Sequence, residues 1–341
     1  MTGFVYDPMF LEHETGTHPE NGNRMLATML LLEECGLLAK LKRIDARDAL
    51  AAELALVHDP AYVAAVQRAA QQGGGWVDPD TLITPRSYDV AARVVGGTLA
   101  ALDAVMRGDV ASAFCLVRPP GHHATPDQAM GFCLFNHVAI AAAYARKQFG
   151  LERVAIVDFD VHHGNGTQDA FYADPGVFYG STHEYPFYPG TGAAREIGAG
   201  AGRGYNINIP MPHGCGDAAY RRAFDEVVLP ALRRYRPELI LVSAGYDAHF
   251  ADEIAGQHVS VDGYGALVAM LKEAAAELCD GRLLLALEGG YHLVALPWSI
   301  RRTLEVLHGD PLTPDPLGTV ATDTPPGFDS MLAEVKALHV L

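Results

Sequence analysis

The sequence predicts a single α/β domain in which helices cover both faces of a parallel sheet. Short runs rich in valine, isoleucine and leucine, typical of strands buried on both faces, alternate with longer segments of helical periodicity. Strands that alternate with helices favour parallel pairing through crossover connections. Because no internal repeat, low-complexity tract or linker divides the chain, we expect residues 1–341 to form one domain.

Each expected element rests on one of these two patterns. Strands are expected at the short apolar runs, which occupy residues 3–6, 113–117, 154–157, 176–182, 205–209, 239–244 and 283–287. Helices are expected where apolar residues recur at helical spacing, over residues 25–35, 61–71, 87–107, 133–149, 217–236, 261–278 and 294–307. Pro60 precedes one of these helices and Gly36 follows another, as these residue types commonly do.

Segments rich in glycine and proline are expected to be loops. Residues 71–85 contain three consecutive glycines and two prolines and predict an exposed loop. Residues 185–204 have a similar composition, and we expect both segments to form the rim of a functional site. The proline-rich tail after about residue 309 is expected to pack loosely.

Composition narrows the class of protein. The net charge of −16 and the sequence pI of about 5.3 argue against direct binding to nucleic acid and favour cationic partners. The five cysteines show no CxxC pair and no disulfide framework, which favours a reducing compartment. No basic segment followed by an apolar core begins the chain, and no apolar run is long enough to span a membrane. We therefore expect a cytoplasmic protein.

Unusual polar residues follow four of the expected strands. His122 and His123 follow one strand, and residues 158–165 follow a second. Asp247 follows a third strand, and residues 289–291 follow a fourth. The carboxyl ends of parallel strands share one edge of a sheet, where α/β proteins bind ligands. A polar turn after a core strand would also contain Asp, Asn and Gly. Four such clusters at one edge nevertheless predict a catalytic site.

The residue types at this edge suit a divalent metal such as zinc. Residues two apart on a strand share a face, so Asp158, Asp160 and His162 could project together. Asp160, His162 and Asp247 would supply the three protein ligands of a catalytic zinc and leave a position for water, which the ion would acidify. The sequence therefore predicts hydrolysis of a carbonyl compound. It contains neither a GxSxG nucleophile motif nor a GxxxxGK[ST] phosphate loop.

Other residues of the clusters could move protons. The adjacent His122 and His123 offer a general base and a general acid, although one could instead only orient the other. Asp158 could hold an imidazole in one tautomer. Tyr291, after two glycines, could donate its hydroxyl to a developing oxyanion, or could be a rim aromatic without a chemical role.

Five motifs together resemble the zinc-dependent histone deacetylase family, which includes bacterial class II-like amidohydrolases and acetylpolyamine amidohydrolases. They occur in the family's order within residues 6–307, and they are RPPGHH at 118–123, GFC at 131–133, DFDVHHGNG at 158–166, SAGYD at 243–247 and EGGY at 288–291. The resemblance implies the arginase/deacetylase-like fold, with a parallel sheet of the eight-stranded type between helices. It also implies that zinc is bound by Asp160, His162 and Asp247.

The same resemblance assigns roles in deacetylation. His123 would act as general base and then acid, His122 paired with Asp158 would assist electrostatically, and Tyr291 would polarise the acetyl carbonyl. Further matched residues would contact substrate or product: Phe132 and Tyr188 as channel walls, Gly131 beside them, Asp80 at the rim, and Arg24 in an internal pocket behind the zinc that lets acetate leave.

Asn165 departs from one branch of the family, which has an aspartate behind the second histidine. Asparagine at this position resembles the class II and bacterial branch. An amide cannot stabilise an imidazolium as a carboxylate would, so we expect a lower pKa for His123.

Family members also bind structural monovalent cations. By the same matching, one potassium would lie close to the zinc, surrounded by Asp158, Asp160, His162, Ser181 and Thr182. A second would be surrounded by Phe171, Asp174, Val177 and Tyr205.

The substrate stays open between acetyl-lysine in a protein or peptide and acetylated polyamines or other small amines, and hydroxamates are expected to inhibit. Assembly into a homo-oligomer is compatible with the resemblance. A two-metal ureohydrolase of the same fold is a remote alternative, because Gly164 and His249 stand where its second metal needs carboxylates. A non-catalytic protein that binds acetylated amines is another.

Overall fold

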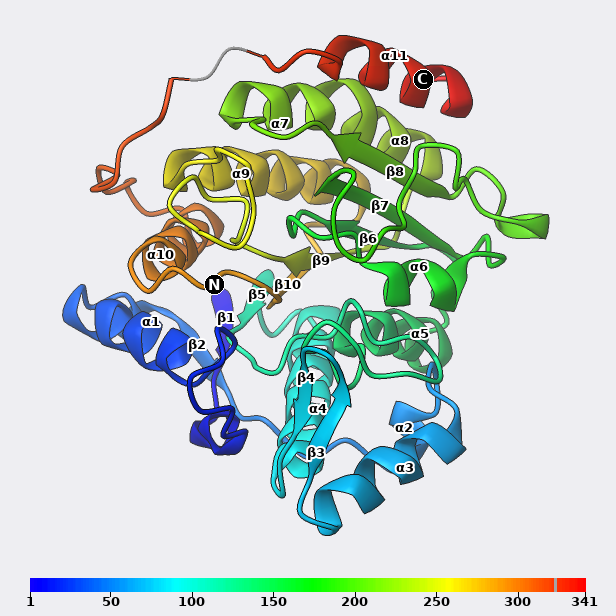
Figure 1. The fold of residues 1–341 in the computed structure, drawn as a ribbon. Helices are drawn as coiled ribbons and strands as arrows, with labels where there is room; N and C mark the ends of the chain where they lie inside the picture. Colours follow the sequence, from blue (N-terminus) through cyan, green and yellow to red (C-terminus); the bar gives the residue numbers. More distant parts are fainter. Residues whose placement is uncertain (322–323) are drawn as a thin grey trace.

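Eight parallel strands form the central sheet of the computed structural model, which describes residues 1–321 and 324–341 (Figure 1). The strand order is β2-β1-β5-β10-β9-β6-β7-β8. The strands are β1 (Thr2–Val5), β2 (Lys42–Ile44), β5 (Ser112–Cys115), β6 (Val154–Asp158), β7 (Val177–Glu184), β8 (Asn206–Met211), β9 (Leu239–Ala244) and β10 (Leu283–Leu287). This confirms the predicted fold class: one α/β domain around an eight-stranded parallel sheet.

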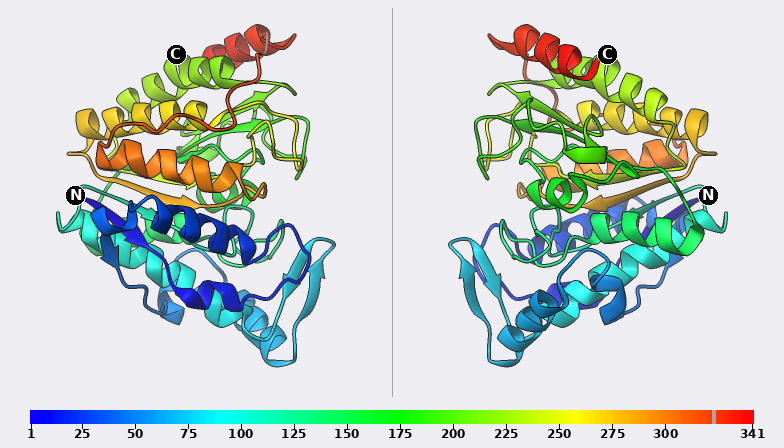
Figure 2. Two further views of the ribbon diagram at one scale, coloured as in Figure 1. Left: turned by 90° about the vertical axis from the view of Figure 1, so that its left-hand side faces the viewer. Right: turned by 90° about the vertical axis from the view of Figure 1, so that its right-hand side faces the viewer.

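Helices cover both faces of the sheet, as Figures 1 and 2 show. One face packs against α4 (Ser87–Met106) and α5 (His137–Phe149), and α3 (Pro60–Gln71) packs on α4. The other packs against α1 (Asn23–Glu34), α7 (Asp217–Ala223), α8 (Leu229–Tyr235), α9 (Val261–Leu278) and α10 (Ala295–His308). The short helices α2 (Ala51–Leu54) and α6 (Asn165–Phe171) complete the layers. The helix expected at 217–236 contains one π-helical turn, Phe224–Val228.

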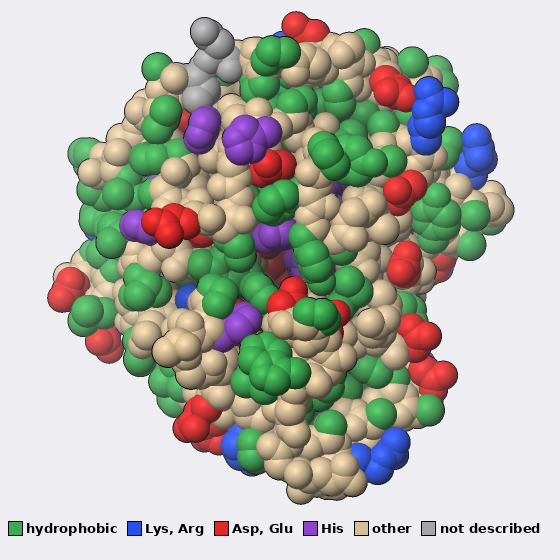
Figure 3. Space-filling model, viewed as in Figure 1, with side chains coloured by type: hydrophobic (Ala, Val, Ile, Leu, Met, Phe, Trp, Pro, Cys, Tyr) green, Lys and Arg blue, Asp and Glu red, His purple; other side chains and the backbone are tan. Residues whose placement is uncertain are grey.

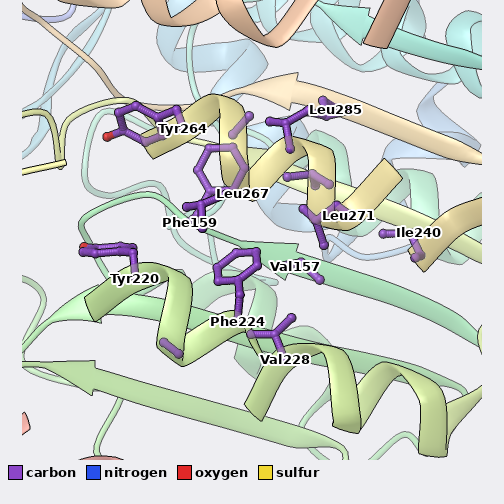
Figure 4. Packing of buried hydrophobic residues seen from close by; sticks show 14 of the residues in the cluster. Val157, Phe159, Tyr220, Phe224, Val228, Ile240, Tyr264, Leu267, Leu271 and Leu285 are labelled. Atoms are coloured by element: carbon purple, nitrogen blue, oxygen red, sulfur yellow. The ribbon is translucent and has the colours of Figure 1, made fainter. Parts of the chain in front are cut away.

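The core between the sheet and α9 explains why the strands are continuous apolar runs. Val157 and Ile240 on the sheet, Leu267 and Leu271 on α9 and Phe224 beside them are almost completely buried (Figure 4). Burying one such side chain contributes about 1.5–3 kcal/mol. Because the strands also face the second helical layer, both of their faces must be apolar.

The segment 71–85 is a β-hairpin, and its prediction as an exposed loop was wrong. Strand β3 (Gly75–Asp78) pairs with β4 (Thr81–Ile83) in antiparallel fashion. Thr81 and Ile83 are buried, whereas Trp76 and Val77 are 60% and 45% exposed. The alternation of side-chain burial that indicates a strand is therefore confined to β4. The three consecutive glycines before it favoured the prediction of a loop instead. Figure 2 shows the hairpin projecting from the body of the molecule.

The tail after residue 309 also differs from its prediction, which was wrong for its last part. Helix α11 (Phe328–His339) packs beside the α7–α8 layer, and Phe328, Leu332 and Val335 are completely or almost completely buried (Figure 1). Residues 310–321 have no regular structure, and residues 322–323 of this tail lie outside the described part of the chain. No helix in the described ranges has the length and apolar character needed to cross a membrane.

We expect Phe328→Ala to lower the free energy of unfolding by about 3 kcal/mol. Removing a buried phenylalanine loses transfer free energy and leaves a cavity. The Arg222 guanidinium, 5.1 Å from the centre of the Phe328 ring, also loses its contact. Urea denaturation measures the change, with the exposed Leu312→Ala (58% exposed) as the control. Equal stability of the two variants would show that α11 contributes little.

Candidate active site

The four strands that precede the polar clusters are neighbours at the centre of the sheet. Their order is β5-β10-β9-β6, and all of them are parallel. From β6 the chain adds β7 and β8 on one side, and it then adds β9 and β10 on the other side of β6, so the direction of winding reverses between β6 and β9. This is the place where open α/β sheets bind ligands. The predicted convergence of the clusters follows from this strand order.

Asp160, His162 and Asp247 lie together at the carboxyl ends of β6 and β9. The Nδ1 atom of His162 is 3.0 Å from Oδ1 of Asp160 and 3.3 Å from Oδ2 of Asp247. All three side chains are buried, and each offers a ligand atom within 4.8 Å of the others. Strand β6 ends at Asp158, so Asp160 and His162 reach this position from the following turn and not, as the alternation predicted, from the strand.

This trio fits a divalent metal. The Oδ2 atom of Asp247 is buried, and its 3.3 Å contact with His162 does not have the geometry of a hydrogen bond, so no described residue donates to it. Burial and the Asp160 carboxylate raise the pKa of Asp247 to about 6, so a bound cation would stabilise the two charged carboxylates. A Cβ at Gly289 would stand 2.0 Å from the same Oδ2 atom, so glycine there keeps space for the carboxylates. Two carboxylates and one imidazole suit zinc.

His122 is held in an acidic environment. Its Nδ1 atom is 3.1 Å from Oδ2 of Asp158, which also accepts a hydrogen bond of 3.0 Å from the Tyr179 hydroxyl. Burial opposes charge on the ring, but Asp160 and Asp158 together raise the pKa of His122 to about 10. The backbone N–H of His122 donates to the buried carboxylate of Glu288. The two carboxylates therefore favour the protonated form of His122.

His123 has the opposite character. Its Nδ1–H donates to Oδ1 of Asn165 over 2.8 Å, which leaves Nε2 as the basic nitrogen. The amide orientation is set by its other end, where Nδ2 of Asn165 donates to the sulfur of Met130. The pKa of His123 lies well below its usual value, as expected. The causes are burial and the neighbouring His122 and His162, whereas the hydrogen bond to Asn165 opposes the shift.

A narrow cavity of about 230 Å³ leads to these residues. Its lining includes Pro120, His122, His123, Gly131, Phe132, His162, Phe187, Tyr188, Ile254, Gly289, Tyr291 and Asp80. The Tyr188 ring stands perpendicular to His123 with centroids 5.1 Å apart, and Phe132 contacts Tyr291 edge-on at 5.8 Å. On the face drawn in Figure 3, histidine side chains lie at the floor of a hollow bordered by hydrophobic ones.

The residues beside the cavity reach it for different reasons. A Cβ at Gly131 would lie 2.4 Å from the His123 ring, so only glycine allows this close approach. The next residue, Phe132, has a φ of 69°, and its N–H donates to Oγ1 of Thr81. Asp80 comes from the turn of the β3–β4 hairpin. A non-glycine residue held in the left-handed region is typical of functional sites.

Arg24 is completely buried and does not line this cavity. It donates hydrogen bonds of 2.6 Å to the carbonyls of Glu288 and Gly290, and its guanidinium is 4.9 Å from the centre of the Tyr291 ring. Glu20 balances its charge. This placement makes Arg24 a support for the turn that carries Tyr291, and its role in an exit pocket for acetate stays a prediction.

The two predicted potassium sets occupy different environments. In the first, Asp158 pairs with Ser181 in the β6–β7 register, and Oγ1 of Thr182 is buried without a partner in the described ranges. In the second, the carbonyls of Phe171 and Tyr205 already accept backbone hydrogen bonds, and the Asp174 carboxylate pairs with Arg146. Val177 begins β7. Both potassium sites stay predictions.

Sequence reasoning missed three side chains that complete the site. The Phe187 ring stacks on the His162 ring with centroids 5.4 Å apart. Glu288 accepts backbone hydrogen bonds from Gly121 and His122, and Tyr179 binds Asp158. Phe187 directly precedes the predicted Tyr188, and Glu288 belongs to the EGGY motif, so the sequence indicated that both could lie at the site. Tyr179 lies inside an apolar strand and had none.

A parallel α/β fold with an Asp-His-Asp trio and a histidine pair at the floor of a narrow cavity is the arrangement of a hydrolase whose trio could hold a metal ion. A family model described as "Histone deacetylase domain" matches residues 18–307. The chain therefore belongs to the histone deacetylase family.

Individual relatives and a solved structure agree with this assignment. The chain is 42% identical to Histone deacetylase 10, chloroplastic, of Oryza sativa subsp. japonica, over 88% of this chain and 71% of that protein. It is 39% identical to the Histone deacetylase-like amidohydrolase of Pseudomonas aeruginosa, over 90% and 86%. The crystal structure of the HDA15 HD domain superposes with a TM-score of 0.91 at 35% identity, covering 99% of this chain and 94% of that one.

Proposed function

We propose that this hydrolase removes the acetyl group from an N-acetylated amine, in the manner of a zinc-dependent deacetylase, and releases acetate. The observation that carries the proposal is that one narrow cavity is lined by His123, His162 and Tyr291, with Asp160 and Asp247 behind them. The apolar walls Phe132, Phe187 and Tyr188 suit the methylene chain of an amine, and the polar floor suits the amide.

The residues at the site would have distinct catalytic roles. Asp160, His162 and Asp247 would hold zinc, which when bound would polarise the acetyl carbonyl and acidify water. His123 accepts the proton of the attacking water at Nε2 and later gives it to the leaving amine. His122, whose Nδ1 is 3.1 Å from Oδ2 of Asp158, assists electrostatically beside His123.

Tyr291 donates its hydroxyl to the same developing charge. Burial holds its pKa well above the usual value, so the phenol stays protonated. Asp80 binds the substrate backbone at the rim. Gly131 lets the protein backbone on this side of the cavity lie close to His123. Arg24 would line an internal pocket behind the zinc through which acetate leaves.

Acetyl-lysine in a protein or peptide is the proposed substrate, and an acetylated polyamine is the alternative. The exposed Trp76 and Val77 on the hairpin beside the cavity favour a substrate that continues past the amine into a longer chain. The test compares acetate release from an acetyl-lysine peptide and from an acetylated polyamine. A higher kcat/KM for the polyamine would make the polyamine the preferred substrate. If neither compound is turned over, the protein would only bind acetylated amines.

The remote ureohydrolase alternative finds no support. A second metal would need a carboxylate near Gly164, and a Cβ there would stand 2.4 Å from Oδ2 of Asp158. The cytoplasmic location stays a prediction, in keeping with five free cysteines.

A hydroxamate is expected to inhibit competitively. Its two oxygens would bind zinc at the open position, while its stem fills the space between Phe132 and Tyr188. Initial rates over a range of substrate concentrations measure the effect, and the matched carboxylic ester serves as the control compound. Failure of a hydroxamate to inhibit at millimolar concentration would argue against an accessible metal.

We expect Asn165→Asp to shift the acid limb of kcat/KM to higher pH. In the parent protein the pKa of His123 lies well below 6.5, so its Nε2 is a free base at neutral pH. A carboxylate beside Nδ1 would stabilise the imidazolium and raise that pKa. Activity of the variant should therefore fall as the pH decreases from 7 to 6, where the parent protein keeps its rate.

The pH profile of kcat/KM for both proteins measures this shift. Asn23→Asp, at the start of α1 and outside the cavity, is the matched control. An unchanged acid limb in the Asn165→Asp variant would mean that His123 does not set the base pKa.

A further inference from the structure

A second pocket lies on another side of the molecule, where α8, α11 and the loop before β8 meet. Its volume is about 640 Å³, and it shares no lining residue with the active-site cavity. Three arginines line it, Arg153, Arg203 and Arg234. This is unusual in a chain of net charge −16 that has 25 Lys and Arg residues against 41 Asp and Glu residues.

Two of the three guanidinium groups have no acidic partner in the part of the chain that the structure describes. Arg153 pairs with Glu152 and approaches Glu238 at 3.9 Å. Arg234 instead donates a hydrogen bond to the carbonyl of His339, and Arg203 is exposed. Arginine presents a planar fork of donors that matches carboxylate and phosphate groups. The pocket therefore has unused capacity for an anion.

A buried imidazole also faces this pocket. His339 is 4% exposed and lines the pocket, yet neither of its ring nitrogens has a hydrogen-bond partner among the described residues. Burial and the Arg234 charge lower its pKa to about 4, so the ring is neutral at pH 7. The Gly204 backbone opposes the shift, but its contact with the ring does not have the geometry of a hydrogen bond. A neutral imidazole offers one donor and one acceptor. Buried polar groups are normally satisfied, so an unpartnered one indicates a missing ligand or water.

The remaining wall is aromatic. The rings of Tyr205 and Tyr235 stand at 63° with centroids 5.5 Å apart, and Phe178 contacts Tyr235 at the same distance. Arginines beside an aromatic wall can bind both the charge and the apolar body of a ligand. Tyr205 also belongs to the second predicted potassium set, but the guanidinium groups make the pocket itself unsuited to a cation.

We infer that this pocket binds a small organic anion whose phosphate or carboxylate groups contact Arg203 and Arg234 and whose apolar body packs on Tyr205 and Tyr235. The ligand would also satisfy the His339 ring. This inference does not rest on deacetylase activity, since the two sites share no residue.

Isothermal titration at low ionic strength with ADP, inorganic pyrophosphate and citrate tests the inference. ADP is expected to bind more tightly than pyrophosphate because it adds an apolar body, and citrate separates carboxylate from phosphate chemistry. Arg203→Glu should weaken binding at least about tenfold, the scale of a lost charge-assisted hydrogen bond. It leaves the Arg234–His339 contact in place, and acetate release should be unchanged.

Two comparisons make the test decisive. The exposed Arg43→Glu, at the opposite edge of the sheet, changes the net charge equally and should not alter binding. Binding should persist in His162→Ala, where chelation at the active-site metal is lost. No binding of any probe at millimolar concentration, equal weakening by Arg43→Glu, or loss of binding in His162→Ala would each overturn the inference.

Discussion

Replacing His162 by alanine is expected to abolish zinc binding and to lower turnover by more than about 100-fold. His162 is the one imidazole of the trio, and its Nδ1 lies within 3.3 Å of both carboxylates. Removing a residue that only hydrogen-bonds to a metal ligand lowers metal affinity or activity by about 10–100-fold, so removing the ligand itself should lower them further. Asp160 and Asp247 alone would bind hard cations better than zinc.

Metal analysis of the purified variant and acetate release measure the two effects. His308→Ala, at the end of α10, is the matched control because it removes a histidine that does not line the cavity. Zinc bound in the same ratio as in the parent protein would contradict the proposed ligand set. Full activity with the zinc lost would instead contradict metal-dependent hydrolysis.

The fold could be predicted because the strands are buried on both faces. Seven apolar runs predicted seven strands of the sheet, and β9 and β10 match their predicted bounds. Strand β2 was missed because it has three residues, of which Lys42 and Arg43 are exposed. An edge strand needs no continuous apolar run. Helix α11 was missed because the proline-rich segment before it obscured a short amphipathic pattern.

The candidate site was predictable to the extent that its residues follow strands. Parallel strands bring their carboxyl ends to one edge, so the motifs converge whatever the loop conformations are. The contacts of Arg24 were not predictable, because they join α1 to backbone carbonyls more than 260 residues away along the chain. The stacking of Phe187 on His162 depends on the path of a long loop, which no local pattern determines.

Tyr291→Phe is expected to lower kcat by about 10²–10³-fold while KM changes little. This is the usual cost of removing one donor to a developing oxyanion. Tyr291 is held in place by contacts of its backbone and its ring, and none of these contacts involves the hydroxyl. The N–H of Tyr291 donates to Asp252 over 2.6 Å, Arg24 lies over the ring, and Phe132 contacts its edge. Phenylalanine can keep all three contacts, so the loss should isolate the hydroxyl.

Steady-state rates with an acetyl-lysine peptide measure this loss, and zinc content must be equal in both proteins. Tyr172→Phe, after α6, removes a phenol that is not part of the cavity lining and should leave the rate unchanged. A rate close to that of the parent protein would make Tyr291 a wall residue only. A rise in KM without a fall in kcat would place its contribution in substrate binding, because a group that acts only on the transition state lowers kcat.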